Sequence, residues 1–405
     1  MNKHSLPEGW SLKKLGEIAT VVSGGTPSRS QPKYWANGNI PWVTPTDITR
    51  DNSLTLLDTK EKITELGLRS SSANLLPSGT LLMTSRATVG EIKISTIPVS
   101  TNQGFKNLIP NALVDKWYLY YQMLFHKESY KQLGNGSTFL EVSKSATESF
   151  EIYYAPLPEQ RAIADILSMV DEAIAKSESL VRKYQSIKQG LMFDLLTRGV
   201  DENGELRASY EEAPELYRET SLGWLPKDWE VLKIRDARKS ITSGSRWWAR
   251  YYANEGALFL RIGNLTREHI NLRFDSIQRV RVPNDAESKR TVVAAGDVLI
   301  SVTADLGIIG VIPKNFEEAY VNQHIALVKV DAEITNPRWL GHFMASRLGW
   351  YQFQTLNDSG AKAGLNLPTV DSLSFANPPR EERNRIVKMI DNQDDMIKVE
   401  KELVT

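Results

Sequence analysis

The most regular hydrophobic pattern of the chain lies near its middle. Apolar positions recur there every seven residues, with a second apolar series between them. The two series are Ile163, Val170, Ser177, Tyr184 and Leu191, and Ile166, Ala173, Leu180 and Ile187. This spacing predicts an amphipathic helix of about 35 residues, on the order of 50 Å long. A shorter stretch near the end of the sequence follows the same template with Ile386, Met389, Ile390, Met396, Ile397, Leu403 and Val404.

The apolar stripe of the long helix needs a partner along its length. A small domain at one end cannot cover a helix of that size, so we expect the second stretch to pair with the first in antiparallel orientation. Such a pair would be a rod that separates two globular parts. Pairing between two molecules is the alternative that the sequence leaves open.

The globular parts are two copies of one unit. Leu6-Pro7-Glu8-Gly9-Trp10 recurs as Leu225-Pro226-Lys227-Asp228-Trp229, and Asn102-Gln103 recurs as Asn322-Gln323. Further matched segments keep the same order, and the offset between copies drifts only between roughly 217 and 225 positions. A preserved order with so small a drift indicates an internal duplication.

Each copy predicts the same elements. Short apolar runs at residues 80–83 and 297–302 each follow a glycine, which is typical of a turn leading into a buried strand. Helical stretches begin near Trp117 and Trp339, and Pro-rich segments end both copies.

The predicted fold class is α+β, with a tandem duplication. The first domain covers residues 1–155, the central helix 156–198 and a polar, acidic linker 199–224. The second domain covers 225–379 and the last helix 380–405.

Composition removes several function classes. The chain has no cysteine, and its five histidines form no H-x-x-x-H pair, so disulfides are excluded and a zinc site is not expected. The N-terminus lacks the apolar core of a signal peptide, and no apolar run is long enough to span a bilayer. We expect a cytoplasmic protein without membrane contact.

The zero net charge hides a small asymmetry. Residues 6–155 hold 15 Lys and Arg against 13 Asp and Glu, and residues 225–379 hold 19 against 16. The segment 156–224 holds 8 against 13. Two slightly basic units with an acidic connector are compatible with nucleic-acid binding, although excesses of this size carry little weight alone.

Three segments resemble catalytic motifs only in part. Asn377-Pro378-Pro379-Arg380 lacks the aromatic of a DNA amino-methyltransferase box, and the chain has no glycine-rich loop for a methyl donor. Glu91-Ile92-Lys93 fits the end of a nuclease motif but has no counterpart in the other copy. Gly24-Gly25-Thr26-Pro27 lacks the lysine of a P-loop. We therefore expect no catalytic centre and no bound metal.

Candidate contact residues lie on corresponding loops of both copies. Arginines and aromatics follow the Ser-Gly loop in each copy, and two further loops follow a predicted strand and a helix. The candidates are Arg29, Lys33, Tyr34, Arg86, Thr88, Ser137 and Thr138 in the first copy, and Ser245, Arg246, Trp247, Arg250, Tyr251, Thr303, Asp305 and Lys362 in the second.

These residue types suit DNA. Arginine can contact phosphates or guanine, and a carboxylate such as that of Asp305 can accept from cytosine N4. The alternative for the aromatic loop is that Trp35 and Trp248 anchor it in the core. Two similar but unlike readers in one chain could recognise two different sequences at a fixed separation, whereas a homodimer of one reader would require a palindrome.

In their order and duplication, these segments resemble the specificity subunit of type I restriction-modification systems over essentially the whole chain. The resemblance is carried by the L-P-x-x-W segments, Ser23-Gly24-Gly25-Thr26-Pro27, Tyr34-Trp35, Ile40-Pro41-Trp42, Pro156-Leu157-Pro158-Glu159-Gln160 and the stretch from Gly199 to Pro226.

The resemblance implies two target-recognition domains, each reading half of a split double-stranded DNA target. It implies two helices in an antiparallel coiled coil, on which methyltransferase subunits dock, and an endonuclease subunit that translocates DNA. S-adenosylmethionine, ATP and Mg would be used by those partners, and this chain would bind no cofactor. The sequence departs from the family at residues 379–383, where P-L-P-E-Q is usual, and its last helix is about a dozen residues shorter than the first.

Two other functions remain open at this point. A methyltransferase or nuclease acting alone would need the donor-binding and metal motifs that the chain lacks. A two-headed protein-binding scaffold could use the same rod.

Overall fold

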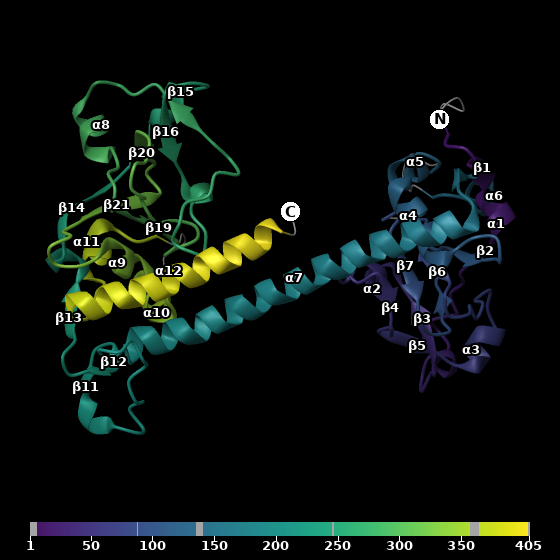
Figure 1. The fold of residues 1–405 in the computed structure, drawn as a ribbon, viewed down its shortest axis with the longest axis horizontal. Helices are drawn as coiled ribbons and strands as arrows, with labels where there is room; N and C mark the ends of the chain where they lie inside the picture. The colour runs from purple at the N-terminus through teal and green to yellow at the C-terminus, as the bar shows by residue number, and fades with distance from the viewer. Residues whose placement is uncertain (1–5, 87, 135–140, 245–246, 357–363, 404–405) are drawn as a thin grey trace. The chain divides into compact units, whose positions relative to one another are not determined.

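The computed structural model describes residues 6–86, 88–134, 141–244, 247–356 and 364–403. The chain divides into two compact units, unit 1 covering 1–175 and unit 2 covering 176–405. One helix, α7 (Leu157–Thr197), contributes to both units (Figure 1). Within the described residues, no helix has the length and apolar character needed to cross a membrane.

The elements of unit 1 before α7 are β1 (Ser11–Lys14), α1 (Leu15–Ile18), β2 (Ala19–Ser23), η2 (Pro32–Tyr34), β3 (Ile40–Val43), α2 (Pro45–Thr49), β4 (Thr55–Leu56), β5 (Glu61–Ile63), α3 (Glu65–Arg69), β6 (Leu81–Met83), β7 (Ile92–Ser95), β8 (Ser100–Thr101), β9 (Lys106–Pro110), α4 (Lys116–Phe125), α5 (Lys127–Lys131), α6 (Lys144–Ser149) and β10 (Glu151–Tyr154).

The elements that follow α7 in unit 2 are η3 (Pro214–Leu216), β11 (Tyr217–Thr220), β12 (Gly223–Pro226), β13 (Glu230–Lys233), η4 (Ile234–Asp236), β14 (Arg238–Ser243), η5 (Trp248–Tyr251), β15 (Tyr252–Ala253), β16 (Ala257–Leu260), η6 (Ile262–Asn264), β17 (Arg279–Val280), α8 (Ala286–Thr291), β18 (Val298–Ser301), β19 (Ile309–Val311), β20 (Ala319–Val321), β21 (Ile325–Val330), α9 (Pro337–Ala345), α10 (Arg347–Thr355), α11 (Leu367–Ser372), β22 (Ser374–Asn377) and α12 (Arg380–Glu402).

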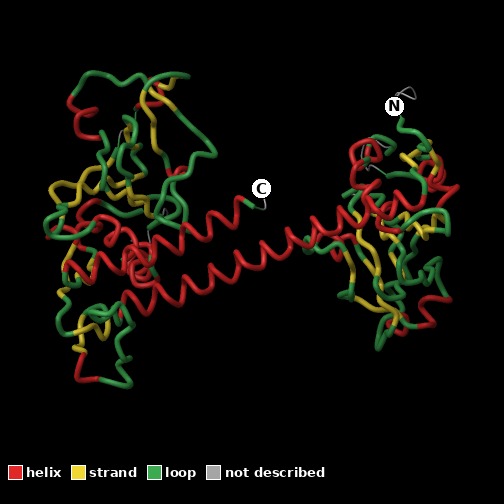
Figure 2. Tube along the Cα trace, in the orientation of Figure 1, coloured by secondary structure: helices red, strands yellow, loops and turns green. Residues whose placement is uncertain are grey.

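The two units have the same sheet topology. The sheet β2-β9-β6-β7 of unit 1, to which β4 adds a fifth strand, corresponds to β14-β21-β18-β19 of unit 2. In each unit a smaller sheet contains one parallel pair, β3 with β8 and β16 with β20. A short antiparallel pair, β1 with β10 or β13 with β22, joins the start of the domain to its end. The duplication predicted from the sequence is therefore present strand by strand, and the α+β prediction is confirmed (Figure 2).

Local sequence explains several of these elements. Gly79 and Gly296 precede β6 and β18 with φ of +87° and +84°, which a residue with a Cβ rarely adopts. The Asp115 carboxylate caps α4 by accepting from the backbone N–H groups of Trp117 and Tyr118. Asn336 caps α9 and is followed by Pro337 at the first helical position.

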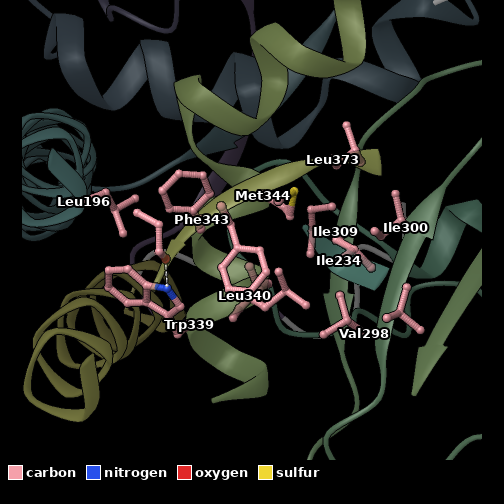
Figure 3. Close-up of a cluster of buried hydrophobic side chains, with 14 of the residues drawn as sticks. Leu196, Ile234, Val298, Ile300, Ile309, Trp339, Leu340, Phe343, Met344 and Leu373 are labelled. Atoms are coloured by element: carbon pink, nitrogen blue, oxygen red, sulfur yellow. Dashed lines mark hydrogen bonds between the residues drawn. The ribbon is translucent and has the colours of Figure 1, made fainter. Parts of the chain in front are cut away.

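The helices pack on the larger sheet of each unit to form its core. In unit 2, Trp339 and Phe343 of α9 are fully buried in one cluster with Val298 and Ile300 of β18 and Leu196 of α7 (Figure 3). The Trp339 indole N–H donates to the Ala376 carbonyl at 2.7 Å, which satisfies the only polar atom of its side chain. The end of α7 is thus part of the core of unit 2.

In unit 2, α12 pairs with the end of α7 in antiparallel orientation. Glu382, in the first turn of α12, accepts a hydrogen bond from the backbone N–H of Val200, just after α7. About three turns further on, Asp394 of α12 accepts a hydrogen bond from Lys188 of α7. The antiparallel pairing of the two helices within one chain, one of the two alternatives from the sequence, is the one observed.

The stretch predicted as a polar linker, residues 199–224, contains regular structure. β11 pairs with β12 in a hairpin that begins inside this stretch and continues to Pro226. Tyr210 stacks on Trp224 with ring centroids 4.3 Å apart. The Arg207 guanidinium donates to the Glu382 carboxylate at 2.8 and 2.9 Å, which fixes the stretch against the start of α12.

Candidate nucleic-acid interface

Three loops of unit 1 come together where its parallel strands end. The Asn102 N–H donates to the Val43 carbonyl at 3.0 Å, so the turn after β8 lies against the end of β3. The Gly25 N–H donates to Thr101, and the Ser85 N–H donates to Gly104 at 2.7 Å. We call residues 23–26, 84–88 and 102–104, of which all but residue 87 are described, the loop edge of unit 1.

Two of these contacts, those of the turn and of the loop after the buried strand, recur in unit 2, and a different bond holds its Ser-Gly loop. The Asn322 N–H donates to Leu260 at 3.0 Å, Gly244 donates to Ile325 at 3.4 Å, and Val302 donates to His324 at 3.0 Å. The loop edge of unit 2 is accordingly residues 243–244, 301–305 and 322–324.

Close backbone approach explains the glycine in each Ser-Gly loop. A Cβ on Gly24 would collide with the backbone oxygen of Asn102, and a Cβ on Gly244 would collide with the backbone oxygens of Val321 and Asn322. Each glycine therefore brings the Ser-Gly loop against the turn that follows the second parallel strand.

The loop edge of unit 1 carries a charged network. The Arg86 guanidinium, which is 44% exposed, lies 2.9 Å from the Glu141 carboxylate. Lys106, almost fully buried behind it, reaches Ser85 Oγ at 3.3 Å and Glu141 at 3.4 Å. The hydrogen bond from Arg86 lowers the pKa of Glu141, and burial lowers the pKa of Lys106.

The loop edge of unit 2 is more neutral at the corresponding place. The His324 imidazole lies between two side chains, with Nδ1 2.6 Å from Thr303 Oγ1 and Nε2 2.8 Å from the Gln323 amide nitrogen. Asp305 is exposed and pairs with Arg267, whose guanidinium also donates to the Leu306 carbonyl at 2.9 Å. Thr303 and Asp305, both predicted as contacts, thus lie on this edge.

The residues predicted after the first Ser-Gly loop are held by neighbours. Arg29 donates two parallel hydrogen bonds to Glu61 at 2.6 and 2.7 Å and lies 3.7 Å above the Trp35 ring. Those contacts lower the pKa of Glu61. Lys33 is exposed, 5.8 Å above the ring of the half-buried Tyr34.

The corresponding residues of unit 2 divide between core and surface. Trp248 is buried and stacks on Phe259. It therefore anchors the loop in the core, which was the alternative to a contact role for this residue. Trp247 is 74% exposed. The Arg250 guanidinium, also exposed, lies 4.8 Å above the half-buried ring of Tyr251.

The remaining predicted contacts are Thr88 and five residues outside the described part of the chain. Thr88 is exposed, and its carbonyl accepts from the Thr84 hydroxyl. Ser137, Thr138, Ser245, Arg246 and Lys362 lie outside the described residues. Two described residues that directly follow these segments contact the loop edges. Glu141 forms an isolated β-bridge with Arg86, and Gly364 forms one with Thr303.

Sequence reasoning did not select Gln103, Gln323 and His324, which lie on the loop edges. The signal was present, because the Asn-Gln pair occurs in both copies. In each copy the asparagine Oδ1 accepts from the backbone N–H two residues on, at 2.8 Å in unit 1 and 3.1 Å in unit 2. The asparagine side chain fixes the turn, and the residues that follow it therefore lie on the loop edge.

The joints between domain and helix repeat in detail. The Trp10 indole donates to Glu159 at 3.1 Å, and the Trp229 indole donates to Glu382 at 3.2 Å. The L-P-x-x-W segment of each unit is therefore bonded to the glutamate in the first turn of the following helix.

The segments that resemble catalytic motifs are occupied by structural contacts. Asn377 accepts a hydrogen bond from Arg383 at the second joint. Glu91 pairs with Lys127 at 2.6 Å, and the buried Lys93 bonds to Asp51 and Ser53. The pKa of Asp51 is lowered by the hydrogen bond from Lys93.

His342, Asp391 and Asp394 of unit 2 are close enough together to suggest a metal site. Burial lowers the pKa of His342. Burial alone would raise the pKa of Asp391, but hydrogen bonds from His342 and Arg338 bring it down to about 2. Since Arg338 and Lys188 already neutralise the two carboxylates, this donor set fits an ion-pair network better than a divalent cation.

Two α+β units with equivalent loop edges, each bonded to the helix that follows it, form a duplicated architecture. The family model of the type I restriction modification DNA specificity domain matches the chain twice, at residues 7–184 and 226–404. The chain therefore belongs to this family.

Curated relatives support the assignment. The MjaIX specificity subunit of Methanocaldococcus jannaschii is 34% identical over 269 residues, which cover 65% of this chain and 59% of that subunit. The MjaVIII specificity subunit of the same organism is 22% identical over 402 residues, covering 98% of this chain and 88% of that subunit. The match to MjaIX thus spans less than two thirds of that relative.

Solved structures share the fold. An S subunit of a type I restriction-modification system from M. genitalium aligns over 100% of this chain and 94% of its own, with a TM-score of 0.60 and 13% identity. A second structure, from work on complex assembly of the type I system, aligns over 99% and 96%, with a TM-score of 0.55 and 18% identity.

Proposed function

We propose that this chain reads a split, asymmetric double-stranded DNA target, with one unit for each half-site. The equivalent but unlike loop edges of the two units support the proposal most directly. Two of the backbone contacts that shape each edge recur in both units, whereas Arg86 and Glu141 stand in unit 1 where Thr303 and Gly364 stand in unit 2. Different side chains on one scaffold are suited to different base edges.

The proposal includes methyltransferase subunits as partners on the helices. Ile166, Met169 and Val170 of α7 are 63%, 70% and 51% exposed. Neighbouring apolar side chains that are exposed to water in this way are typical of a surface that a partner covers. In unit 2, α7 and α12 line a groove of about 960 Å³ that includes Phe193, which is 55% exposed. Apolar side chains exposed on a helix suit partner helices.

An endonuclease subunit that translocates DNA completes the proposed complex, which would act in the cytoplasm. S-adenosylmethionine, ATP and Mg would be bound by the partners, while this chain would bind no cofactor and would not act as an enzyme by itself.

A methyl-transfer assay tests this division of labour. The purified chain with S-adenosylmethionine and DNA should transfer no methyl groups, and transfer should begin when the modification subunit is added. A pre-mixed modification subunit without this chain serves as the control and should lack sequence preference. Methyl transfer by the chain alone would show that it is an enzyme and would refute the proposal.

A further inference from the structure

The turns that present the two loop edges differ at one pair of positions. The turn of unit 1 has Gly104 where unit 2 has His324, and the neighbouring loop has Arg86 where unit 2 has Thr303. A Cβ built on Gly104 would lie 4.0 Å from the Arg86 Cβ and 3.0 Å from Asn102 Oδ1. Arg86 therefore lies close to the place where a side chain at position 104 would begin.

In unit 2 the sizes are reversed. The short Thr303 leaves room for the His324 imidazole, which contacts its hydroxyl at 2.6 Å. A long side chain beside a glycine in unit 1 is thus replaced by a short side chain beside a histidine in unit 2. The two arrangements place different polar groups at the same point of the loop edge.

The hydrogen bonds of His324 fix the neighbouring Gln323. When the Gln323 amide nitrogen donates to His324 Nε2, the proton of the imidazole is on Nδ1 and is donated to Thr303 Oγ1. Gln323 then retains one N–H and its carbonyl oxygen for another partner. One donor beside one acceptor is the pattern that adenine N7 and N6 complement in the major groove.

Arg86 offers a different pattern. Its Nη2 lies 2.9 Å from the Glu141 carboxylate, and a guanidinium carries five N–H groups, so the exposed side chain has donors besides the one that faces Glu141. Two parallel donors complement guanine O6 and N7. The carboxylate restricts the orientation of the guanidinium, as preorganised recognition requires.

We propose that this shared position determines base specificity in both units. Arg86 reads guanine in the half-site of unit 1, and Gln323, positioned by His324, reads adenine in the half-site of unit 2. The inference rests on the proposed function, because it presumes that each loop edge enters a groove of DNA.

Selection of bound sequences from a random DNA pool by the full chain tests the inference. Arg86→Ala should remove a guanine preference at one position of one half-site, a loss of discrimination of about 5- to 150-fold, and leave the other half-site unchanged. Gln323→Glu has the shape of the native residue but only acceptors, so the preference at one position of the other half-site should shift from adenine to cytosine.

His324→Ala separates positioning from contact. It should weaken the adenine preference without replacing it by another base, because Gln323 remains but is no longer oriented. Asn203→Asp, on an exposed turn outside both loop edges, is the control for the added charge and should leave both motifs intact.

The selection separates failure of the proposed function from failure of the base assignment. If the native chain selects no motif, the proposed function fails and the inference with it. If the native chain selects two motifs but Arg86→Ala and Gln323→Glu only lower the overall affinity, the loop edges contact the backbone and the inference is overturned. Loss of a different base at either position would overturn the base assignment.

Discussion

At the residue scale, the two copies use different side chains for one structural task. At the first joint, the Gln160 amide donates to the Ala155 carbonyl at 2.8 Å. At the second joint, the Arg383 guanidinium donates to Asn377 and to the Ile334 carbonyl. The departure from the usual family segment at residues 379–383 therefore preserves the joint, because an arginine there reaches the same kind of acceptors as the glutamine.

The equivalent glutamates of the joints differ in burial, and this difference yields a prediction. Glu382 is 3% exposed and bonds to Arg207, Trp229 and the Val200 N–H. Glu382→Ala should lower the free energy of unfolding by about 3–5 kcal/mol, because the Val200 N–H and the Trp229 indole lose their acceptor and Arg207 keeps only the exposed Asp228 as a partner. Chemical denaturation measures this loss.

Glu159→Ala is the matched control at the other joint. The exposed Glu159 is hydrogen-bonded to the Trp10 indole, and its loss should cost about 1 kcal/mol or less. Equal losses for the two variants would contradict the role given to the buried network around Glu382.

At the element scale, the sequence predicts which segments form helices better than it predicts which residues pair. The seven-residue pattern indicated a long helix after the first domain, and α7 spans Leu157–Thr197. The contact between Lys188 and Asp394 could not be predicted, because charged residues in an amphipathic pattern normally face solvent. They are buried here because the Thr266–Ile270 loop of unit 2 covers them, as the hydrogen bond from Lys188 to the Glu268 carbonyl shows.

The buried pair predicts a strong coupling between α7 and α12. Asp394→Ala should destabilise unit 2 by about 3–5 kcal/mol, because Lys188 remains buried without its partner. Adding Lys188→Met should recover part of that loss, since it removes the uncompensated charge. Denaturant unfolding of both single variants and the double variant completes the cycle.

Lys183→Met, on the exposed face of the same helix, should change stability by no more than about 0.5 kcal/mol. Additive losses for Lys188→Met and Asp394→Ala would show that the two side chains do not interact.

Only some of the residues on the loop edges could be predicted from the sequence. Arg86, Thr303 and Asp305 lie on loops after strands, as predicted, because a glycine and an apolar run mark each strand. Gln323 and His324 were not selected, since their role depends on hydrogen bonds between the turn and a neighbouring loop. Contacts between segments distant in the sequence leave no periodic signal.

At the scale of the whole molecule, the duplication organises both structure and function. The repeated strand order and joints show that one unit was copied with its framework, as the segment matches predicted. The side chains on the loop edges diverged, as the pair Arg86 and Thr303 illustrates. A chain with two unlike readers can recognise an asymmetric target, which two identical readers cannot do.

The most direct test of the central claim is the native chain's own selection from a pool of random double-stranded DNA. The account predicts two short, unlike motifs in every bound sequence, separated by a gap of constant length. A single motif, two identical inverted motifs, or a gap of variable length would contradict the assignment of one half-site to each unit.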